Sequence, residues 1–205
     1  MKILCGAGKT TLLEGLSGVI PSAGGSIEID GHEIHRARPG ARVNAGLAHV
    51  EQGRTVFREL TTDENLRAGA ASASEVKTPT DCFPNCSLGA TSRPELLSGG
   101  EQQMLVIARV LVGRPKILLI DEMSAGLAPT VVRRLMTVVR KLADQGLAIM
   151  LVEQLAMLAL GVGDRAYVLR RGKIVYDGDC TELCDASDKL DRLYLGDSKA
   201  DIAPR

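Results

Sequence analysis

The feature that most constrains the fold of this chain is a glycine-rich turn that runs directly into a helical pattern. The turn reads Gly6-Ala7-Gly8-Lys9-Thr10-Thr11, and apolar residues then recur at helical spacing as far as Leu16. Such a turn lets successive backbone N–H groups converge on phosphate, while the helix N-terminus adds its positive end. A lysine at this spacing reaches the β- and γ-phosphates, and the next hydroxyl binds magnesium. The sequence therefore predicts a phosphate-binding loop served by Lys9 and Thr10.

The turn carries only part of the full phosphate-loop pattern. The complete pattern has another glycine in the place of Ile3, and a preceding strand for which only Met1 and Lys2 remain. A chance glycine-rich turn is the alternative interpretation.

A second motif supplies what such a loop needs. The apolar run Ile117 to Ile120 predicts a buried strand, and Asp121 and Glu122 follow at its carboxyl end. Asp121 would hold magnesium through water, and Glu122 would polarise the water that attacks the phosphate. The alternative is a buried strand that ends in a solvated acidic turn.

A third motif predicts another helix start with free N–H groups. Ser98-Gly99-Gly100-Glu101 precedes a helical pattern over residues 101–111, and such a start binds anions through its backbone. One chain has one phosphate loop, so a second set of phosphate-facing N–H groups makes sense if these groups contact the nucleotide bound by another molecule. A simple helix cap is the alternative.

Strand and helix patterns alternate along most of the chain, which is typical of a mainly parallel α/β sheet. We expect strands over residues 26–31, 45–50, 117–120, 147–152, 165–169 and 173–176, and helices over 10–17, 101–111 and 129–145, with a short helix after residue 152. Small residues and prolines predict an irregular, partly helical insert at about 61–97. We expect one domain over residues 1–205, with its core in 1–60 and 98–205.

Composition excludes several classes of protein. The 25 basic residues balance 25 acidic ones, so no charge excess points to nucleic acid. The longest apolar stretch is interrupted by Glu153 and Gln154, and no secretory leader pattern follows Met1, so we expect a cytoplasmic protein without a membrane span.

The cysteines and histidines do not form a convincing metal motif. Cys82 and Cys86, and likewise Cys180 and Cys184, are four residues apart, and a proline lies within the first pair. A zinc site is the weaker alternative, and we expect reduced, incidental thiols. His32 and His35 are expected at the surface.

These motifs, in this order, resemble those of ABC transporter ATP-binding subunits. Gln52 then corresponds to the glutamine loop of the family, and residues 97–103 to its signature. Within the superfamily the sequence is most similar to importers of branched-chain amino acids and related amides, through Gly53–Phe57, Ser98–Met104, Gly126–Pro129, Leu151–Gln154 and Tyr194–Gly196.

The resemblance implies a P-loop NTPase (RecA-like) fold with helices on both faces of the sheet and a small helical subdomain. It implies ATP and Mg²⁺ as ligands, with Glu122, Gln154 and Gln52 in hydrolysis and Thr10, Gln52 and Asp121 at the metal. The implied nucleotide-binding residues are Cys5, Gly6, Ala7, Gly8, Lys9, Thr10 and Thr11, and in the partner's site Ser98, Gly99, Gly100 and Glu101. Implied partners are a second ATP-binding subunit, transmembrane permease subunits and, indirectly, a solute-binding protein, at the cytoplasmic face of the membrane.

Two departures from the family pattern bear on function. Gln154 stands where most of the superfamily has a histidine that senses the γ-phosphate, and a glutamine cannot carry a positive charge. Relatives also carry antiparallel strands and an adenine-stacking aromatic residue before the phosphate loop. These are missing here, so we expect altered base recognition.

Three functions remain open. The first is a transport ATPase. The second is a truncated, non-hydrolysing ABC module that only docks or dimerises. The third, a soluble ABC ATPase of DNA repair or translation, would carry a long coiled-coil insert or two tandem cassettes, and neither pattern is present.

Overall fold

The computed structural model describes residues 1–6, 8–53, 55–69, 92–186, 190 and 192–193. Several residues singled out in the sequence, Ala7, Cys82, Cys86 and Tyr194–Gly196, lie outside these described residues, as does most of the expected insert. None of the helices in the described parts has the length and apolarity needed to cross a membrane.

A six-stranded, mainly parallel sheet organises the described chain. Its strands run in the order β4 (Leu47–Val50), β5 (Ile117–Asp121), β6 (Ala148–Val152), β1 (Lys2–Gly6), β7 (Arg165–Arg170) and β8 (Lys173–Asp179). All neighbouring pairs are parallel except β7 and β8. The expected α/β sheet is therefore confirmed.

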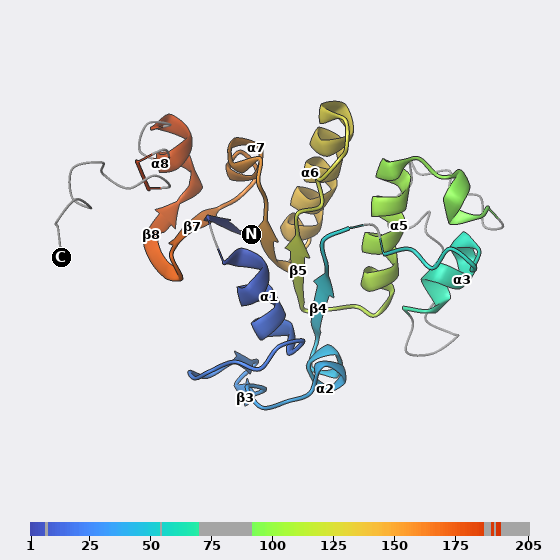
Figure 1. Ribbon diagram of the computed structural model, residues 1–205, viewed down its shortest axis with the longest axis horizontal. Helices are drawn as coiled ribbons and strands as arrows, with labels where there is room; N and C mark the ends of the chain where they lie inside the picture. Colours follow the sequence, from blue (N-terminus) through green and yellow to red (C-terminus); the bar gives the residue numbers. More distant parts are fainter. Residues whose placement is uncertain (7, 54, 70–91, 187–189, 191, 194–205) are drawn as a thin grey trace, which may run out of the picture.

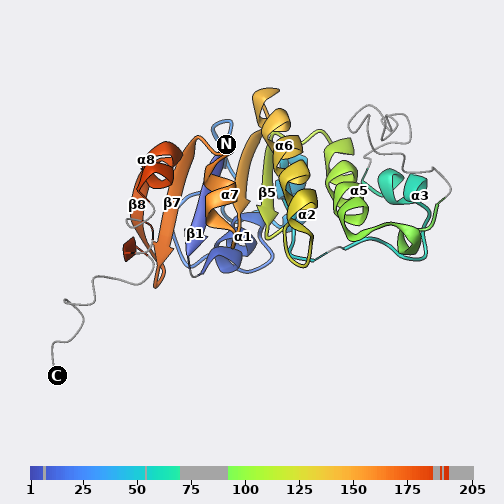
Figure 2. The same cartoon turned by 90° about the horizontal axis from the view of Figure 1, so that it is seen from above.

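Helices cover both faces of this sheet. On β5, Leu118 and Ile120 point into the larger core, whereas Leu119 points into a smaller core on the other face, with Leu13 of α1 (Lys9–Ser17). The larger core is closed by α5 (Gly99–Val112), α6 (Pro129–Asp144), α7 (Ala156–Leu160) and α8 (Cys180–Asp185). Figures 1 and 2 show these four helices following one another along the molecule.

Two of the sequence-based strand assignments were wrong. The single strand expected over residues 26–31 is instead a short antiparallel hairpin of β2 (Glu28–Ile29) and β3 (His32–Glu33), because Asp30 and Gly31 both adopt positive φ and turn the chain. The strand before the glycine-rich turn is not limited to Met1 and Lys2, since β1 continues to Gly6.

Two short helices were not predicted. One is α2 (Pro39–Asn44), which starts at a proline, and the other is α8. In α8, Cys180 is buried, Cys184 is half-buried, and both are free thiols.

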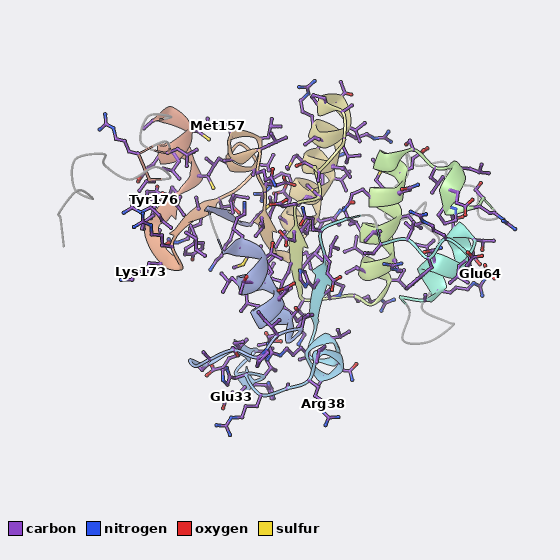
Figure 3. All side chains as sticks on the ribbon, viewed as in Figure 1. Glu33, Arg38, Glu64, Met157, Lys173 and Tyr176 are labelled. Atoms are coloured by element: carbon purple, nitrogen blue, oxygen red, sulfur yellow. The ribbon has the colours of Figure 1, made fainter. Side chains whose placement is uncertain are left out.

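The described edges of the expected insert lie at one end of the molecule. They comprise α3 (Thr62–Arg67) and the 3₁₀ turn η2 (Pro94–Leu96), beside α5. The side-chain view places Glu64 of α3 at the opposite end from Lys173 and Tyr176 of β8 (Figure 3).

Candidate functional site

The carboxyl ends of four adjacent parallel strands bring the predicted site residues to one edge of the sheet. β4, β5, β6 and β1 are neighbours in that order. The segments that leave these ends carry Gln52, the pair Asp121 and Glu122, Gln154, and the glycine-rich turn. Ligands of open α/β sheets bind at this edge, because the loops that leave it can converge there.

The glycine-rich turn connects β1 directly to α1, and every residue of the turn except Ala7 is among the described residues. Cys5 and Gly6 complete β1, and α1 begins at Lys9. Gly8 has φ of 90° and a Cβ there would meet only Leu169, at 4.0 Å, so the backbone conformation and not crowding favours glycine. Thr10 and Thr11 occupy the first turn of α1, where backbone N–H groups are free to bind an anion.

Glu122 is the point on which the other predicted residues converge. Gln52 Nε2 and Gln154 Nε2 each donate to Glu122 Oε2 at 2.8 Å. Lys9 Nζ lies 3.8 Å from Glu122 Oε1. All three residues predicted to act in hydrolysis are thus brought together, with the phosphate-loop lysine beside them.

The backbone of Glu122 is also unusual. Its φ is 43°, in the left-handed region that a glutamate rarely adopts, and its N–H donates to Val152 O at 2.9 Å. Non-glycine residues held in this region cost of order 1–3 kcal/mol and concentrate at functional sites. The hydrogen bond to β6 holds the turn after β5 in this conformation.

Asp121 is buried with its charge uncompensated by protein groups. It is 1% exposed, and neither carboxylate oxygen has a hydrogen-bond partner among the described residues. A buried carboxylate without partners is costly. Two orphaned oxygens at this place fit a hydrated Mg²⁺ ion, which prefers oxygen ligands and keeps several of its waters.

The second predicted phosphate-binding segment forms the start of α5. Ser98 is its N-cap: the Ser98 N–H and hydroxyl both donate to Glu101 Oε2, at 2.8 and 2.6 Å, and Glu101 N–H donates back to Ser98 Oγ at 3.4 Å. These bonds, the one from the Ser98 hydroxyl foremost, lower the pKa of Glu101, so its carboxylate is charged at neutral pH. The expected helix cap is therefore present, and its bonds occupy the Ser98 N–H, the Ser98 hydroxyl and the Glu101 N–H.

Gly99 and Gly100 complete this turn, and Gly100 is required by packing. A Cβ on Gly100 would lie 2.4 Å from Cγ1 of Val131 in α6, closer than atoms can approach. Within the described residues, no hydrogen bond or ion pair joins Ser98 or Glu101 to the cluster around Glu122. Within one copy of the chain, the described residues therefore show no hydrogen bond or ion pair between the start of α5 and the cluster around Glu122.

Two residues of the site were missed by the motif analysis. Glu153 is fully buried, accepts from Ser124 N–H at 3.1 Å and from the Ser124 hydroxyl, and its backbone carbonyl accepts from Lys9 Nζ at 3.4 Å. Burial raises the pKa of Glu153. An acidic residue at the end of an apolar strand was the available signal; Glu153 entered the sequence analysis as an interruption of a hydrophobic stretch and as part of the Leu151–Gln154 resemblance, without a role of its own.

Comparison with known proteins identifies the relatives of this chain. The family model described as ABC transporter matches residues 4–125. The high-affinity branched-chain amino acid transport ATP-binding protein BraG of Pseudomonas aeruginosa is 38% identical, over 93% of this chain and 84% of its own length. The probable branched-chain amino acid transport ATP-binding protein LivF of Archaeoglobus fulgidus is 35% identical over the same shares. The lipopolysaccharide export system ATP-binding protein LptB of Escherichia coli K12 is 30% identical, over 94% of this chain and 83% of its own length.

Solved structures agree on the fold. A nucleotide-free ATP-binding cassette from an ABC transporter superposes with a TM-score of 0.83 at 21% identity, covering 96% of this chain and 88% of the other. A cassette in its ADP conformation gives the same TM-score, identity and coverage. The sheet with helices on both faces is thus the ABC ATPase fold. The chain belongs to the ABC transporter family, among ATP-binding subunits similar to those of branched-chain amino acid transporters.

Proposed function

We propose that this chain binds ATP with Mg²⁺ and hydrolyses it to energise an importer of branched-chain amino acids or related small amides. The observation that carries this proposal is the convergence of Lys9, Gln52 and Gln154 on Glu122, beside the orphaned carboxylate of Asp121. A non-hydrolysing module that only docks or dimerises would need none of these contacts.

Each residue then has a separate task. The loop around Gly8 and the start of α1 hold the phosphates, and Lys9 leaves Glu122 to neutralise the β- and γ-phosphate oxygens. Thr10, Gln52 and Asp121 hold Mg²⁺, which supplies positive charge to the transferring phosphoryl group when bound. Glu122, released from Lys9, takes the proton of the attacking water.

Gln52 and Gln154 orient Glu122 for this step. Both amides donate to one oxygen, Oε2, which leaves Oε1 as the acceptor for water. Gln154 stands where most of the superfamily has a histidine. Because a glutamine cannot carry a positive charge, Gln154 acts by hydrogen bonding alone. A pocket of about 340 Å³, lined by Gly53, Val56, Gln103 and Met123 among others, opens beside Glu122 and gives its carboxylate room to move.

The site is completed by a second subunit. Ser98, Gly99, Gly100 and Glu101 are not joined to the Glu122 cluster by hydrogen bonds within the described residues, so we place them against the γ-phosphate bound by the partner subunit. Two ATP molecules are then buried between two subunits. Closure of this dimer pulls on permease subunits at the cytoplasmic face of the membrane, and hydrolysis resets them.

Residues at about 61–97 form the subdomain that faces the permease in this proposal. Its described edges, α3 and η2, lie beside α5 at the end of the molecule, so a shift there is transmitted to Ser98 at the start of the same helix. No nucleic-acid partner is proposed.

The solute and the direction of transport rest on the relatives. BraG and LivF are described as branched-chain amino acid transport proteins, whereas LptB belongs to an export system. The higher identity to BraG favours amino-acid import. Uptake of radiolabelled leucine into vesicles that carry the chain with its permease and binding protein, with ATP supplied on the side of this chain, tests the assignment, and efflux instead of uptake would contradict it.

Hydrolysis is tested on the purified chain. Phosphate release from Mg-ATP is measured for the wild type, Glu122→Gln and Lys9→Ala. We expect Glu122→Gln to lower kcat by about 10²- to 10⁴-fold while ATP still binds, and Lys9→Ala to weaken binding itself. Glu28→Gln, an exposed glutamate of β2, is the matched control and should leave both quantities unchanged. ATP binding without any hydrolysis in the wild type would support the docking module instead.

A further inference from the structure

The structure buries a second glutamate directly behind the proposed catalytic one. Glu153 lies at the end of β6 with none of its surface exposed to solvent. No lysine or arginine among the described residues forms an ion pair with its carboxylate. Transferring an unpaired carboxylate into a protein interior is costly, and an apolar side chain of the same volume would fill the space more cheaply. The position of Glu153 therefore needs an explanation beyond packing.

Its hydrogen bonds supply that explanation. Ser124, which lies in the turn after β5, donates twice: its N–H bonds Oε1 at 3.1 Å and its hydroxyl bonds Oε2. A backbone hydrogen bond from the neighbouring Gln154 adds to these. Ser124 follows Glu122 by two positions, and Glu153 immediately precedes Gln154. The contact joins the two turns that carry the proposed catalytic groups.

Two further bonds run between the same turns. Glu122 N–H donates to Val152 O at 2.9 Å, and Gln154 Nε2 donates to Glu122 Oε2 at 2.8 Å. The backbone carbonyl of Glu153 also accepts from Lys9 Nζ at 3.4 Å. Glu153 is thus one end of a set of bonds whose other end is the Glu122 carboxylate.

We propose that Glu153 is a positioning residue for hydrolysis: its carboxylate clamps Ser124 and thereby keeps Glu122 in hydrogen-bonding register with Gln154. Without this clamp the turn after β5 loses one of the links that hold Glu122 in its strained left-handed backbone conformation. Glu153 touches neither water nor phosphate in this role. The inference rests on the proposed ATPase activity.

The test uses two replacements of similar volume. Glu153→Met fills the space but offers only a weak acceptor, whereas Glu153→Gln keeps one carbonyl oxygen for the Ser124 N–H and an amide that can donate to the Ser124 hydroxyl. We expect Glu153→Met to lower kcat on the order of 10- to 100-fold, with little change in KM for ATP, because a small misplacement of a catalytic group has this cost. Glu153→Gln should retain kcat to within about threefold. Glu33→Gln, an exposed glutamate labelled in Figure 3, is the control for loss of charge alone.

A double variant separates positioning from general destabilisation. If Glu153 acts through Ser124, the combination Ser124→Ala with Glu153→Met should cost little more than Glu153→Met alone, since both changes break one link. Three results would overturn the proposal. In the first, the kcat losses of Ser124→Ala and Glu153→Met multiply in the double variant; in the second, the kcat of Glu153→Met stays within twofold of the wild type. In the third, Glu153→Met and Glu153→Gln lower kcat equally.

A second measurement does not depend on hydrolysis. Hydrogen–deuterium exchange should accelerate in Glu153→Met over residues 121–128 and 152–157, and stay unchanged in α6. If the wild type proves inactive, the proposed function fails, yet this readout still decides whether Glu153 joins the two turns. Unchanged exchange in both segments would show that it does not.

Discussion

The ammonium of Lys9 lies 3.8 Å from Oε1 of Glu122, so the residue proposed to bind phosphate is paired with the residue proposed to activate water. Both side chains are about nine-tenths buried, which limits screening of this pair by solvent. A phosphate that binds Lys9 must compete with this carboxylate. Binding of ATP is thereby linked to release of Glu122 for catalysis.

This pairing predicts the effect of neutralising Glu122 on binding. Glu122→Gln should bind ATP more tightly than the wild type by roughly 3- to 10-fold, which corresponds to about 1 kcal/mol, because the competing charge is removed. Titration with a fluorescent ATP analogue in the presence of Mg²⁺ measures this. Weaker binding by Glu122→Gln would mean that the pair does not compete with phosphate.

The side-chain amides of Gln52 and Gln154 both donate to Glu122, so each should compensate in part for the loss of the other. At saturating Mg²⁺, which offsets the loss of Gln52 as a proposed metal ligand, Gln52→Ala or Gln154→Ala removes one of two bonds to the same oxygen. Each should then lower kcat by only about 3- to 10-fold. The double variant should lose more than the product of the single losses, because Glu122 Oε2 then has neither donor. Steady-state kinetics on the three variants, with Gln145→Ala in the exposed turn after α6 as control, decide this.

The charge of Glu101 should oppose closure of the proposed dimer. Its carboxylate occupies the Ser98 N–H and hydroxyl and would repel a phosphate that approaches them. Glu101→Gln keeps a side chain that can complete the capping box but removes the charge. In a Glu122→Gln background, we expect it to lower the ATP concentration needed for dimerisation by about 3- to 10-fold.

Light scattering across an ATP titration measures that shift. Glu95→Gln, an exposed glutamate of the nearby η2, is the control. An unchanged or raised midpoint for Glu101→Gln would show that the carboxylate is not a barrier to closure.

Arg42 should be a major determinant of stability although it lies outside the site. Its guanidinium is buried and donates to four backbone carbonyls, of Gly15, Leu16, His35 and Ala37, which fastens the end of α1 to the chain before α2. Arg42→Met should lower the free energy of unfolding by about 3 kcal/mol, because four partly buried carbonyls lose their donor. Arg38→Met, at the exposed start of α2 (Figure 3), should cost under about 0.5 kcal/mol. Urea denaturation of both variants makes the comparison, and equal losses would contradict the assignment.

Burial of Glu153 predicts a pH dependence of stability. Its pKa is raised by burial in the folded protein, so its contribution to stability is fully present below the ordinary glutamate pKa of about 4.3 and is lost as pH rises through the folded value. A glutamine does not titrate, so Glu153→Gln should not lose stability in this pH range. The difference in melting temperature, variant minus wild type, should therefore increase from pH 5 to pH 8, and a flat or falling difference would contradict it.

Local patterns in the chain were sufficient to predict most of the fold. The alternation of apolar runs and helical spacing located the core strands from β4 to β8 and the helices α1, α5 and α6 to within a few residues, because those patterns reflect burial on one or both faces. The hairpin of β2 and β3 was predicted as one strand, since the turn at Asp30 depends on positive φ at a non-glycine residue. The short helices α2 and α8 have too few residues for periodicity to reveal them.

The sequence by itself determined which chemical groups the protein carries and in what order: a phosphate loop at Lys9, an acidic pair at Asp121, and a second helix start at Ser98. It could do so because each motif is a local arrangement whose spacing is set by a single turn or strand end. Only the tertiary structure decided that Gln52, Gln154 and Lys9 meet at Glu122 and that Glu153 is buried against Ser124. Those contacts depend on the order of β4, β5, β6 and β1 in the sheet, and strand order is fixed by packing between distant segments, which no local pattern records.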